Sequence, residues 1–321
     1  MTSRFSGLRK LALILFALPV AILILGALYT AYAEHQAELE FPARGEFLNV
    51  STGKLHYTDA SAGDAIVLLH GASSNLREFE SSLQPLFAKR YRVLSFDRPG
   101  YGYSERDLSN WPTPADQARA VHEALQRLGV RRPVLVGHSW SGSVVMAYAL
   151  AYPNDTRAVV SLAGGTHSWK GGVAWHVSLA QQPILGEIFA RTVVMPLGQL
   201  IAPSAANFVF WPEHPPINYA NKTGMQLAIR PSAFRSSAQD IGQLSEFLKS
   251  QSPQYPNLQV PVLVFTGTHD HVVPGWNHAT RVIRQYPQAQ LQLLQGAGHG
   301  LHHTRADVIV ERVNAFLERH P

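Results

Sequence analysis

The sequence predicts an α/β fold in which helices cover both faces of a doubly wound, mostly parallel sheet. Short runs rich in valine, isoleucine and leucine alternate with longer stretches of helical periodicity along most of the 321 residues. Some of these runs, such as 65–69, are apolar without interruption, which is typical of a parallel strand buried on both faces. The charged fraction is only 15%, and the chain is long enough to bury a large core.

The amino-terminal segment, residues 1–33, is predicted to be a membrane anchor or a signal segment. Residues 11–33 form 23 consecutive uncharged positions, enough to cross a bilayer as a transmembrane helix. Basic residues precede this stretch and place the amino terminus in the cytoplasm, with the large domain on the outer (periplasmic or extracellular) side. They are Arg4, Arg9 and Lys10. The alternative is secretion after cleavage following Ala33, because Ala31-Tyr32-Ala33 matches an A-x-A site.

The core is predicted in two parts, residues 34–163 and 241–321. Strands are expected at 46–50, 54–57, 65–69, 91–96, 134–136, 158–163, 261–266 and 291–294. Helices are expected at 76–89, from Thr113 to Gly129, at 142–151 and after Thr304. Thr113 and Thr304 are each followed three positions later by aspartate, which predicts a threonine N-cap at both helices.

Residues 164–240 are predicted to be an irregular, mainly helical lid inserted into this core. The strand-like runs stop there, and tryptophan, phenylalanine and proline become frequent. The tryptophans either line an apolar pocket or form the lid's own small core, and the sequence leaves both interpretations open.

Charge and cysteine content exclude several classes of function. Once the three amino-terminal basic residues are set aside, 24 basic and 22 acidic residues remain, which argues against a nucleic-acid partner. The chain has no cysteine, so disulfides, thiolate metal sites and cysteine nucleophiles are excluded. We expect no cofactor and no metal. His269 and His271 are interpreted as loop residues, because no suitable acid–histidine spacing accompanies them.

The stretch 134–151 predicts a nucleophile. A buried strand turns sharply at Gly137-His138-Ser139 and continues into an apolar helix. A serine at such a turn presents its hydroxyl at a helix N-terminus, where free N–H groups stabilise an oxyanion. Ser139 is therefore the candidate nucleophile rather than a simple helix cap.

A serine hydroxyl needs a base and a group that orients the base. Asp270 follows the strand at 261–266, and His299 follows the strand at 291–294 in the motif Gly298-His299. The carboxyl ends of these strands should bring both residues to Ser139. The competing histidines, His302 and His303, are expected on the surface at the start of a helix.

The sequence resembles the α/β-hydrolase superfamily, in particular its lid-bearing esterase, epoxide-hydrolase and dehalogenase-like branch. The motifs that carry the resemblance are His70-Gly71, the stretch 97–104 (DRPGYGYS), Gly137-His138-Ser139-Trp140, Asp270 and Gly298-His299. The resemblance implies that Ser139 attacks, His299 is general base and acid, and Asp270 orients His299. It further implies an oxyanion hole made by the backbone N–H groups of Ala72 and Trp140.

The sharp turn around Ser139, here called the elbow, departs from the G-x-S-x-G pattern of this family. Ser141 occupies the last position of the pattern, and glycine follows only at Gly142. A tight contact is therefore expected near Ser141. Asp97 and Arg98 are interpreted as a brace for the loop beneath the site, and His70 as structural.

These features predict a serine hydrolase that cleaves an ester or similar acyl bond of a small, apolar substrate. Carbon–carbon bond hydrolysis, acyl transfer and cofactor-free peroxidase chemistry use the same triad and stay open. Haloalkane and epoxide chemistry need a carboxylate nucleophile and are disfavoured. A membrane-anchored binding protein without catalysis is the alternative from another class.

Overall fold

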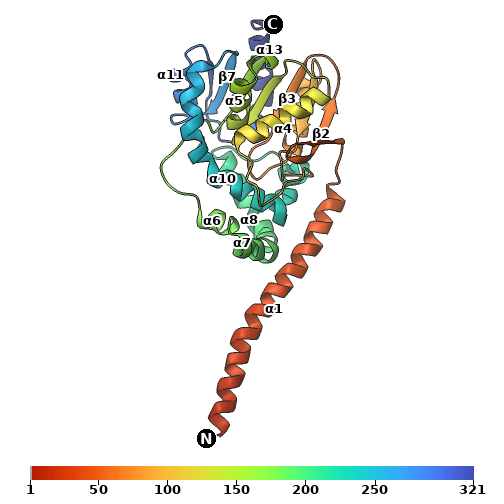
Figure 1. The fold of residues 1–321 in the computed structure, drawn as a ribbon, viewed down its shortest axis with the longest axis vertical. Coiled ribbons are helices and arrows are strands. Elements are labelled where there is room, and N and C mark those ends of the chain that lie inside the picture. The colour runs from red at the N-terminus through yellow and green to blue at the C-terminus, as the bar shows by residue number, and fades with distance from the viewer. Residues whose placement is uncertain (1) are drawn as a thin grey trace.

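A computed structural model describes residues 2–321 of the chain, and it describes side chains from residue 16 onward. The basic residues at positions 4, 9 and 10, on which the predicted membrane orientation depends, therefore lie outside the described side chains. A rounded body carries the C-terminus at one end, and a single long helix, α1 (Thr2–Glu40), leaves the other end (Figure 1).

An eight-stranded sheet forms the centre of the described body. Its order is β1-β2-β4-β3-β5-β6-β7-β8; the pairs β1–β2 and β2–β4 are antiparallel and the rest are parallel. The predicted α/β class with a mostly parallel sheet is confirmed. The strands are β1 (Glu46–Val50), β2 (Gly53–Ala60), β3 (Ala65–Leu69), β4 (Arg92–Phe96), β5 (Val134–His138), β6 (Ala158–Leu162), β7 (Val262–Gly267) and β8 (Gln290–Leu294).

Alternate side chains of the central strands enter two separate cores. Val67 and Leu135 face one core, whereas Leu68 and Val136 face the other, as the period of two in a strand requires. The first core is covered by α4 (Pro114–Arg127), α5 (Ser141–Ala151) and α11 (Ala279–Gln285). The second is covered by α2 (Arg77–Glu80), α3 (Gln84–Phe87) and α13 (Ala306–Glu318). The sheet is therefore enclosed on both faces.

The observed starts of the helices can be compared with the two predicted threonine N-caps. Thr113 caps α4 as expected: its hydroxyl accepts from the N–H of Asp116, whose carboxylate accepts from the N–H of Thr113. The predicted Thr304 cap is wrong. Thr304 ends the short helix α12 (Leu301–Thr304), and its hydroxyl donates to Glu213 at 2.8 Å, so it is not available to α13. The helix expected over 76–89 is divided into α2 and α3, with Pro85 in the first turn of the second.

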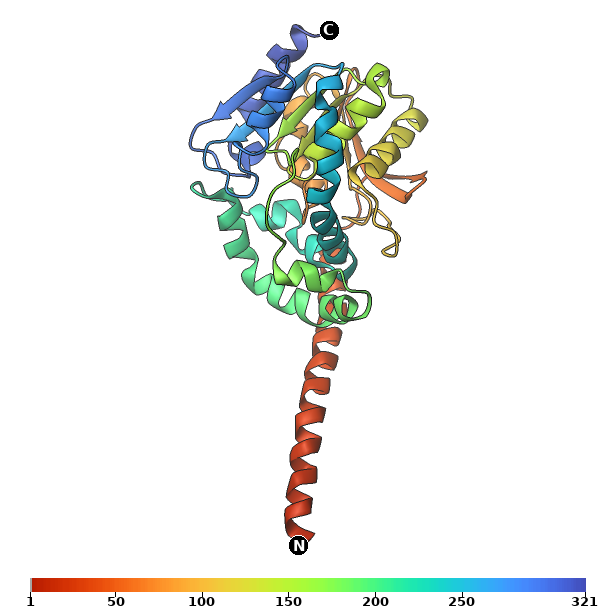
Figure 2. The same cartoon turned by 60° about the vertical axis from the view of Figure 1, so that its left-hand side comes forward.

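The helices between β6 and β7, here called the cap helices, lie at the end of the body from which α1 leaves (Figures 1 and 2). They are α6 (Trp175–Ala180), α7 (Pro183–Phe189), the π-helical turn η2 (Ala190–Val194), α8 (Met195–Phe210), α9 (Tyr219–Thr223), the 3₁₀ turn η3 (Met225–Ile229) and α10 (Pro231–Gln251). The 3₁₀ turn η4 (Ser252–Asn257) leads back to the sheet. Because α10 runs without interruption past residue 240, the boundary predicted there falls inside a helix.

One side of α1 packs against the cap helices. Thr30, Ala33 and Ala37 are buried, and they follow one another at the spacing of a helix face. Gly26 lies so close to Thr192 of η2 that a Cβ atom would come 2.2 Å from its carbonyl oxygen. The Tyr29 hydroxyl donates to Gln199 Oε1 in α8 at 2.5 Å. The last turns of α1 are therefore part of the folded body.

Two described helical stretches are long and apolar enough to cross a membrane by length and composition: Phe16–Glu40 and Pro183–Phe210. The first belongs to α1 and overlaps the predicted anchor. The second comprises α7, η2 and α8 of the cap helices.

Candidate active site

Three predicted site residues meet at the carboxyl edge of the sheet. Ser139 directly follows β5, Asp270 follows β7, and His299 follows β8. His299 Nε2 lies 2.8 Å from Ser139 Oγ, and His299 Nδ1 lies 2.9 Å from Asp270 Oδ2. Residues separated by as many as 160 positions are thus joined in a serine–histidine–aspartate chain, an arrangement that can activate a serine hydroxyl.

Asp270 is held as an anion. Burial alone would raise the pKa of this carboxyl, but the neighbouring imidazole of His299 and its hydrogen bond outweigh that effect and lower the pKa. The backbone N–H groups of Val273 and Val272 donate to Oδ1 at 2.8 and 2.9 Å and act in the same direction. An ionised Asp270 fixes His299 with its Nδ1 proton toward the acid, which leaves Nε2 free to accept the serine proton.

The elbow holds Ser139 in a conformation that L-residues seldom adopt, with φ of +52°. Three backbone bonds of 2.9 Å fix it: its N–H donates to Leu162, and its carbonyl accepts from Gly142 and Gly165. A Cβ atom at Gly71 would come 2.9 Å from the Cβ of Ser139, so glycine there lets the loop after β3 approach the nucleophile.

The departure at Ser141 has a local explanation. Ser141 is fully buried, and its hydroxyl donates to the His70 carbonyl at 2.5 Å. The close contact falls one residue later, where a Cβ atom at Gly142 would lie 2.5 Å from the Cα of Gly164. Serine at position 141 therefore joins the helix to the end of β3, while Gly142 allows α5 to pack on the segment after β6.

The two predicted oxyanion donors flank Ser139. Within the described residues, neither the N–H of Ala72 nor that of Trp140 donates to another protein group, so both are free to bind an oxyanion. The Trp140 side chain is anchored separately, with its indole N–H donating to the Asp240 carbonyl at 2.9 Å.

The loop carrying Ala72 is braced from below, as expected. Arg98 is buried and donates to the carbonyls of His70 and Gly71, both at 3.0 Å. His70 is also buried, and its Nε2 accepts from the N–H of Arg98 at 3.0 Å. Asp97 accepts from the N–H of Leu76 at 2.8 Å, which fixes the start of the following helix.

The acid that completes this brace was not predicted from the sequence. Asp240 of α10 is fully buried and forms two salt bridges. Its Oδ2 lies 2.6 Å from Arg98 Nη1, and its Oδ1 lies 2.7 Å from Arg106 Nη1. This ion network joins α10 to the sheet core directly beneath the oxyanion loop. Arg98 and Arg106 each have an acid beside them in the sequence, so no signal there pointed to Asp240, which lies 142 positions after Arg98.

The expectation that His302 and His303 lie on the surface is wrong. His302 is only 2% exposed, and His303 is half-buried between the rings of Phe210 and Tyr219. Burial lowers the pKa of His303 to about 4. The reason is that α12 lies beneath the cap helices rather than on the surface.

A cluster of Glu78, His138 and His302 lies beside the site. Their ligand-type atoms all fall within 4.8 Å of one another, a donor set that suits zinc. Although burial opposes ionisation, the charge of His138 and its hydrogen bond lower the pKa of Glu78 well below its usual range. His138 Nε2 in turn lies 3.3 Å from the His299 carbonyl, so the cluster supports residues on both sides of Ser139. His269 and His271 are exposed and belong to no such group among the described residues.

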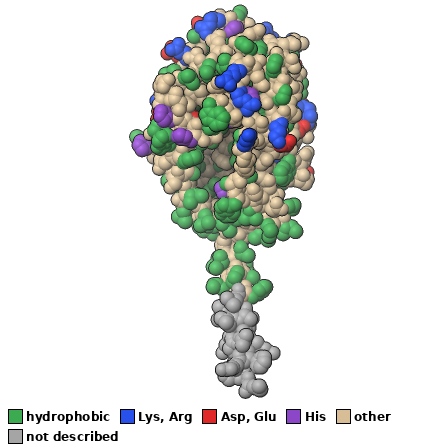
Figure 3. Space-filling model, turned by 90° about the vertical axis from the view of Figure 1, so that its left-hand side faces the viewer, with side chains coloured by type: hydrophobic (Ala, Val, Ile, Leu, Met, Phe, Trp, Pro, Cys, Tyr) green, Lys and Arg blue, Asp and Glu red, His purple; other side chains and the backbone are tan. Residues whose placement is uncertain are grey.

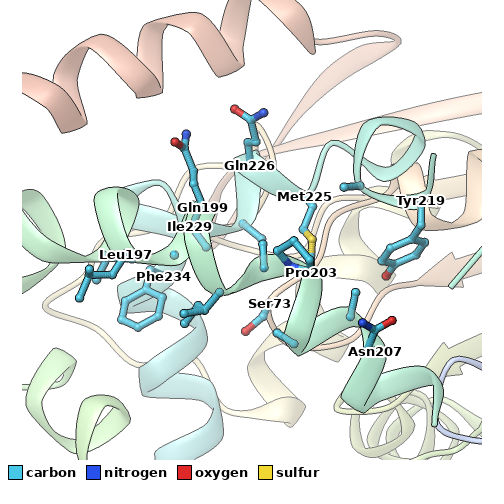
Figure 4. Close-up of a pocket in the computed structure, with 18 of the residues that line it drawn as sticks. Ser73, Leu197, Gln199, Pro203, Asn207, Tyr219, Met225, Gln226, Ile229 and Phe234 are labelled. Atoms are coloured by element: carbon cyan, nitrogen blue, oxygen red, sulfur yellow. The ribbon is translucent and has the colours of Figure 1, made fainter. Parts of the chain in front are cut away.

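A cavity of about 850 Å³ lies among the cap helices, and its lining is mainly apolar (Figure 4). Ser73, which follows Ala72, is the lining residue nearest in sequence to the site, whereas Ser139 and His299 are not part of the wall. Trp175 lines the cavity, so one of the cap tryptophans fits the pocket interpretation. The lining includes no arginine or lysine among the described residues.

Comparison with known proteins gives the same fold. Residues 64–306 match the family model described as alpha/beta hydrolase fold. The chain is 25% identical over 295 residues to the 2-hydroxy-6-oxononadienedioate/2-hydroxy-6-oxononatrienedioate hydrolase 1 of Dechloromonas aromatica, covering 86% of this chain and 96% of that one. The corresponding hydrolase of Klebsiella pneumoniae is 24% identical over 294 residues, with the same coverage.

Two solved structures share the fold of the body. The enol-lactonase of Burkholderia xenovorans superposes with a TM-score of 0.70 at 22% identity, covering 85% of this chain and all of that one. An esterase of Thermogutta terrifontis gives a TM-score of 0.69 at 18% identity, covering 86% of this chain and all of that one.

Proposed function

Because the chain belongs to the alpha/beta hydrolase fold family, we propose that it is a serine hydrolase that cleaves an ester or similar acyl bond through an acyl-serine intermediate. The observation that carries the proposal is the position of His299, within hydrogen-bonding distance of both Ser139 and Asp270. The roles proposed for the three side chains need a base within reach of the serine and an acid within reach of the base, and the two distances support this.

In the first half of the reaction, Ser139 Oγ attacks the carbonyl carbon and its proton passes to His299 Nε2. The carbonyl oxygen becomes an oxyanion, which accepts hydrogen bonds from the N–H groups of Ala72 and Trp140. Asp270 stabilises the imidazolium that forms. The bond to the leaving alcohol then breaks, and His299 gives the alcohol its proton.

In the second half, water attacks the acyl-serine while His299 Nε2 takes one of its protons. The oxyanion forms again at the same two N–H groups. Collapse of this intermediate releases the carboxylic acid and returns the proton to Ser139 Oγ. The enzyme is thereby restored with no redox change and no additional reactant.

The wall of the cavity favours an apolar acyl substrate. The relatives from Dechloromonas and Klebsiella are named for dioates, which carry two carboxylates. A site for such a substrate needs cationic partners, and the described cavity wall offers neither arginine nor lysine. Carbon–carbon bond hydrolysis is the second candidate, because those relatives are named as hydrolases of 2-hydroxy-6-oxo dioates and the same triad serves this reaction.

Labelling with a fluorophosphonate probe tests the proposal. The probe reacts with an activated serine, so the intact protein should be labelled and Ser139→Ala should not. Ser141→Ala is the matched control: it removes the neighbouring buried hydroxyl and its bond to His70, and should keep labelling at a stability cost of about 1 kcal/mol. An unlabelled intact protein, beside a labelled reference serine hydrolase, would favour the non-catalytic binding protein.

A substrate series separates the two enzymatic candidates. Turnover should be measured with p-nitrophenyl esters of graded acyl length and with a 2-hydroxy-6-oxo-dienoate. The ester proposal expects the higher kcat/KM with esters and an increase with chain length. The opposite ranking supports carbon–carbon bond hydrolysis.

We further propose that residues 11–33 anchor the protein and that the cap helices within 164–240 act as a lid over the site. In this arrangement the body lies on the outer side of the membrane, as the basic amino-terminal residues favour. Mass analysis of the mature amino terminus tests the anchor, because a chain starting at Glu34 would show that the segment is a cleaved signal and the body is secreted.

A further inference from the structure

The contact between α1 and the cap helices constrains where the cap helices lie relative to a membrane. Within α1, the uncharged stretch is bounded by Lys10 and Glu34. If residues 26–33 stayed outside the bilayer, only 15 uncharged residues would remain, about 22 Å of helix against a hydrocarbon core of about 30 Å. The spanning segment therefore needs residues 26–33.

Those same residues carry contacts to the cap helices. Gly26 lies against the Thr192 backbone in η2, and Tyr29 donates to Gln199 in α8. Thr30 and Ala33 are buried on the same side of α1. If α1 spans the membrane with the contacts intact, η2 and α8 lie at the depth of residues 26–33, the last two turns of the uncharged stretch. The salt bridge of 2.7 Å between Glu38 and Arg230 then marks the level at which water is reached.

The surface of the cap helices suits that position. Large apolar side chains of α7 and α8 point outward, and Figure 3 shows apolar groups gathered at the end of the body next to α1. They are Ile184 (74% exposed), Leu185, Ile188, Leu197, Leu200 (76% exposed) and Ile201. We call these six residues the apolar face. The stretch 183–210 contains only two charged residues, Glu187 and Arg191, and they pair with each other.

The stretch Pro183–Phe210 lies along the body rather than crossing a bilayer. Ala190, Val194 and Phe210 are buried, so its middle and its end are held against the protein. Because one side of this stretch is held against the protein and its exposed side is apolar, it is suited to lie along a membrane with its axis parallel to the surface. The aromatic residues Tyr29, Tyr32 and Trp175 are exposed in the same region, as is typical of groups at headgroup level.

The cavity opens at this surface. Trp175, Leu197 and Ile201 line the cavity and are each more than half exposed, so they form its rim. In Figure 4, Leu197 lies at one end of the group of lining residues, and Ser73 lies between it and Asn207. A molecule that enters across the rim therefore travels from the apolar face toward the loop that carries Ala72.

We propose that the apolar face is immersed in the outer leaflet and that the cavity takes its substrate directly from the lipid phase. The substrate class is a membrane-dissolved ester with a long hydrocarbon chain that fills the cavity. This inference rests on the proposed anchor and serine hydrolase, and it commits the apolar face to one occupant, the acyl region of a bilayer.

Depth measurement tests the immersion. Because the chain has no cysteine, Leu200→Cys and Leu293→Cys each give a unique site for a nitroxide spin label in the full-length protein. Both positions are more than half exposed, but Leu293 lies on β8, away from the cap helices. In phosphatidylcholine vesicles, the label at 200 should be accessible to oxygen and protected from a water-soluble nickel chelate. The label at 293 should be accessible to the chelate and less accessible to oxygen. Equal access of the chelate to both labels overturns the inference.

A functional pair of assays separates this inference from the proposed activity. The double variant Leu200→Glu, Ile184→Glu changes only the apolar face, since neither residue lines the cavity. It should lose at least about tenfold activity on a long-chain ester dissolved in vesicles, while hydrolysis of water-soluble p-nitrophenyl butyrate changes less than about twofold. Leu293→Glu should change neither. Unchanged vesicle activity in the double variant refutes the inference alone, whereas absence of both activities and of fluorophosphonate labelling in the unmodified protein refutes the hydrolase proposal.

Discussion

The backbone N–H of His299 donates a hydrogen bond of 3.0 Å to the carbonyl oxygen of Val209, the penultimate residue of α8. The N–H of Gly300 donates to the same oxygen at 3.3 Å. The loop that holds the proposed base is therefore attached to the cap helices as well as to β8. Movement of α8 and the orientation of His299 are coupled through this contact.

Gly298→Ala should disturb that attachment. A Cβ atom at position 298 would lie 2.4 Å from the Trp211 carbonyl oxygen and 2.7 Å from that of Phe210, so the loop or the end of α8 must shift. We expect kcat to fall by at least about tenfold, because the imidazole leaves its position against Ser139. Gly172→Ala, where the added atom meets open space, is the control for steady-state kinetics. A Gly298→Ala enzyme with normal kcat would show that the attachment is not needed.

Asp270→Asn should keep the fold and lose most of the activity. The amide cannot stabilise the imidazolium, and it favours the wrong tautomer of His299, so kcat should fall about 10⁴-fold with little change in KM. Asp307→Asn, an exposed acid in the first turn of α13, serves as the control. A loss smaller than about tenfold in Asp270→Asn would assign the orienting role to another residue.

Asp240→Asn should unfold the protein more readily. The substitution leaves the buried side chains of Arg98 and Arg106 without their anionic partner, which typically costs about 3–5 kcal/mol. The free energy of unfolding in urea measures the effect. Glu246→Gln removes an exposed partner of Lys249 and should cost less than about 0.5 kcal/mol. Similar values for the two variants would contradict the bracing role of Asp240.

Acid should destabilise the fold through His278. Burial lowers its pKa from 6.5 to about 4, and its Nδ1 accepts the N–H groups of Thr166 and His167 at 3.1 and 3.2 Å. Above pH 6.5 the His278 side chain is neutral in both the folded and the unfolded chain. Between pH 6.5 and 4 the unfolded chain takes up the proton first, so up to about 3 kcal/mol of stability is lost as pH falls.

His278→Gln keeps an acceptor but does not titrate. Its stability, measured by urea unfolding at several pH values, should fall less steeply between pH 6.5 and 4 than that of the unmodified protein. His214→Gln changes an exposed histidine and should leave the slope as it is. An unaltered slope in His278→Gln would place the acid sensitivity elsewhere, for example on His70 or His167, whose pKa values burial also lowers to about 4.

The sheet and the grouping of Ser139, Asp270 and His299 were predictable because the fold class fixes their geometry. Each residue directly follows a strand, and parallel strands present their carboxyl ends at one edge. The chemistry of a hydrolase limits which residue types belong there. Strand ends and residue types together were therefore enough to place the three side chains within hydrogen-bonding distance of one another.

Contacts made between distant elements were not predictable in this way. Asp240 pairs with Arg98 across 142 positions, and Glu78 of α2 pairs with His138 at the end of β5, with α3, β4 and α4 between them in the chain. No periodicity links either pair. Thr304 fitted the cap pattern, but its hydroxyl donates instead to Glu213, which lies in the connection between α8 and α9. The packing of α1 left one faint signal, the small residues Gly26, Thr30 and Ala33 on one side of the helix.

The burial of Ala33 turns the fate of the amino terminus into a kinetic competition. The A-x-A site lies within the unbroken helix α1, and Ala33 is only 4% exposed in the folded chain. A peptidase binds its substrate extended, so α1 must unwind and separate from the cap helices before cleavage. If the body is exported as proposed, cleavage after the cap helices have folded requires their local unfolding, so fast folding would preserve the proposed anchor.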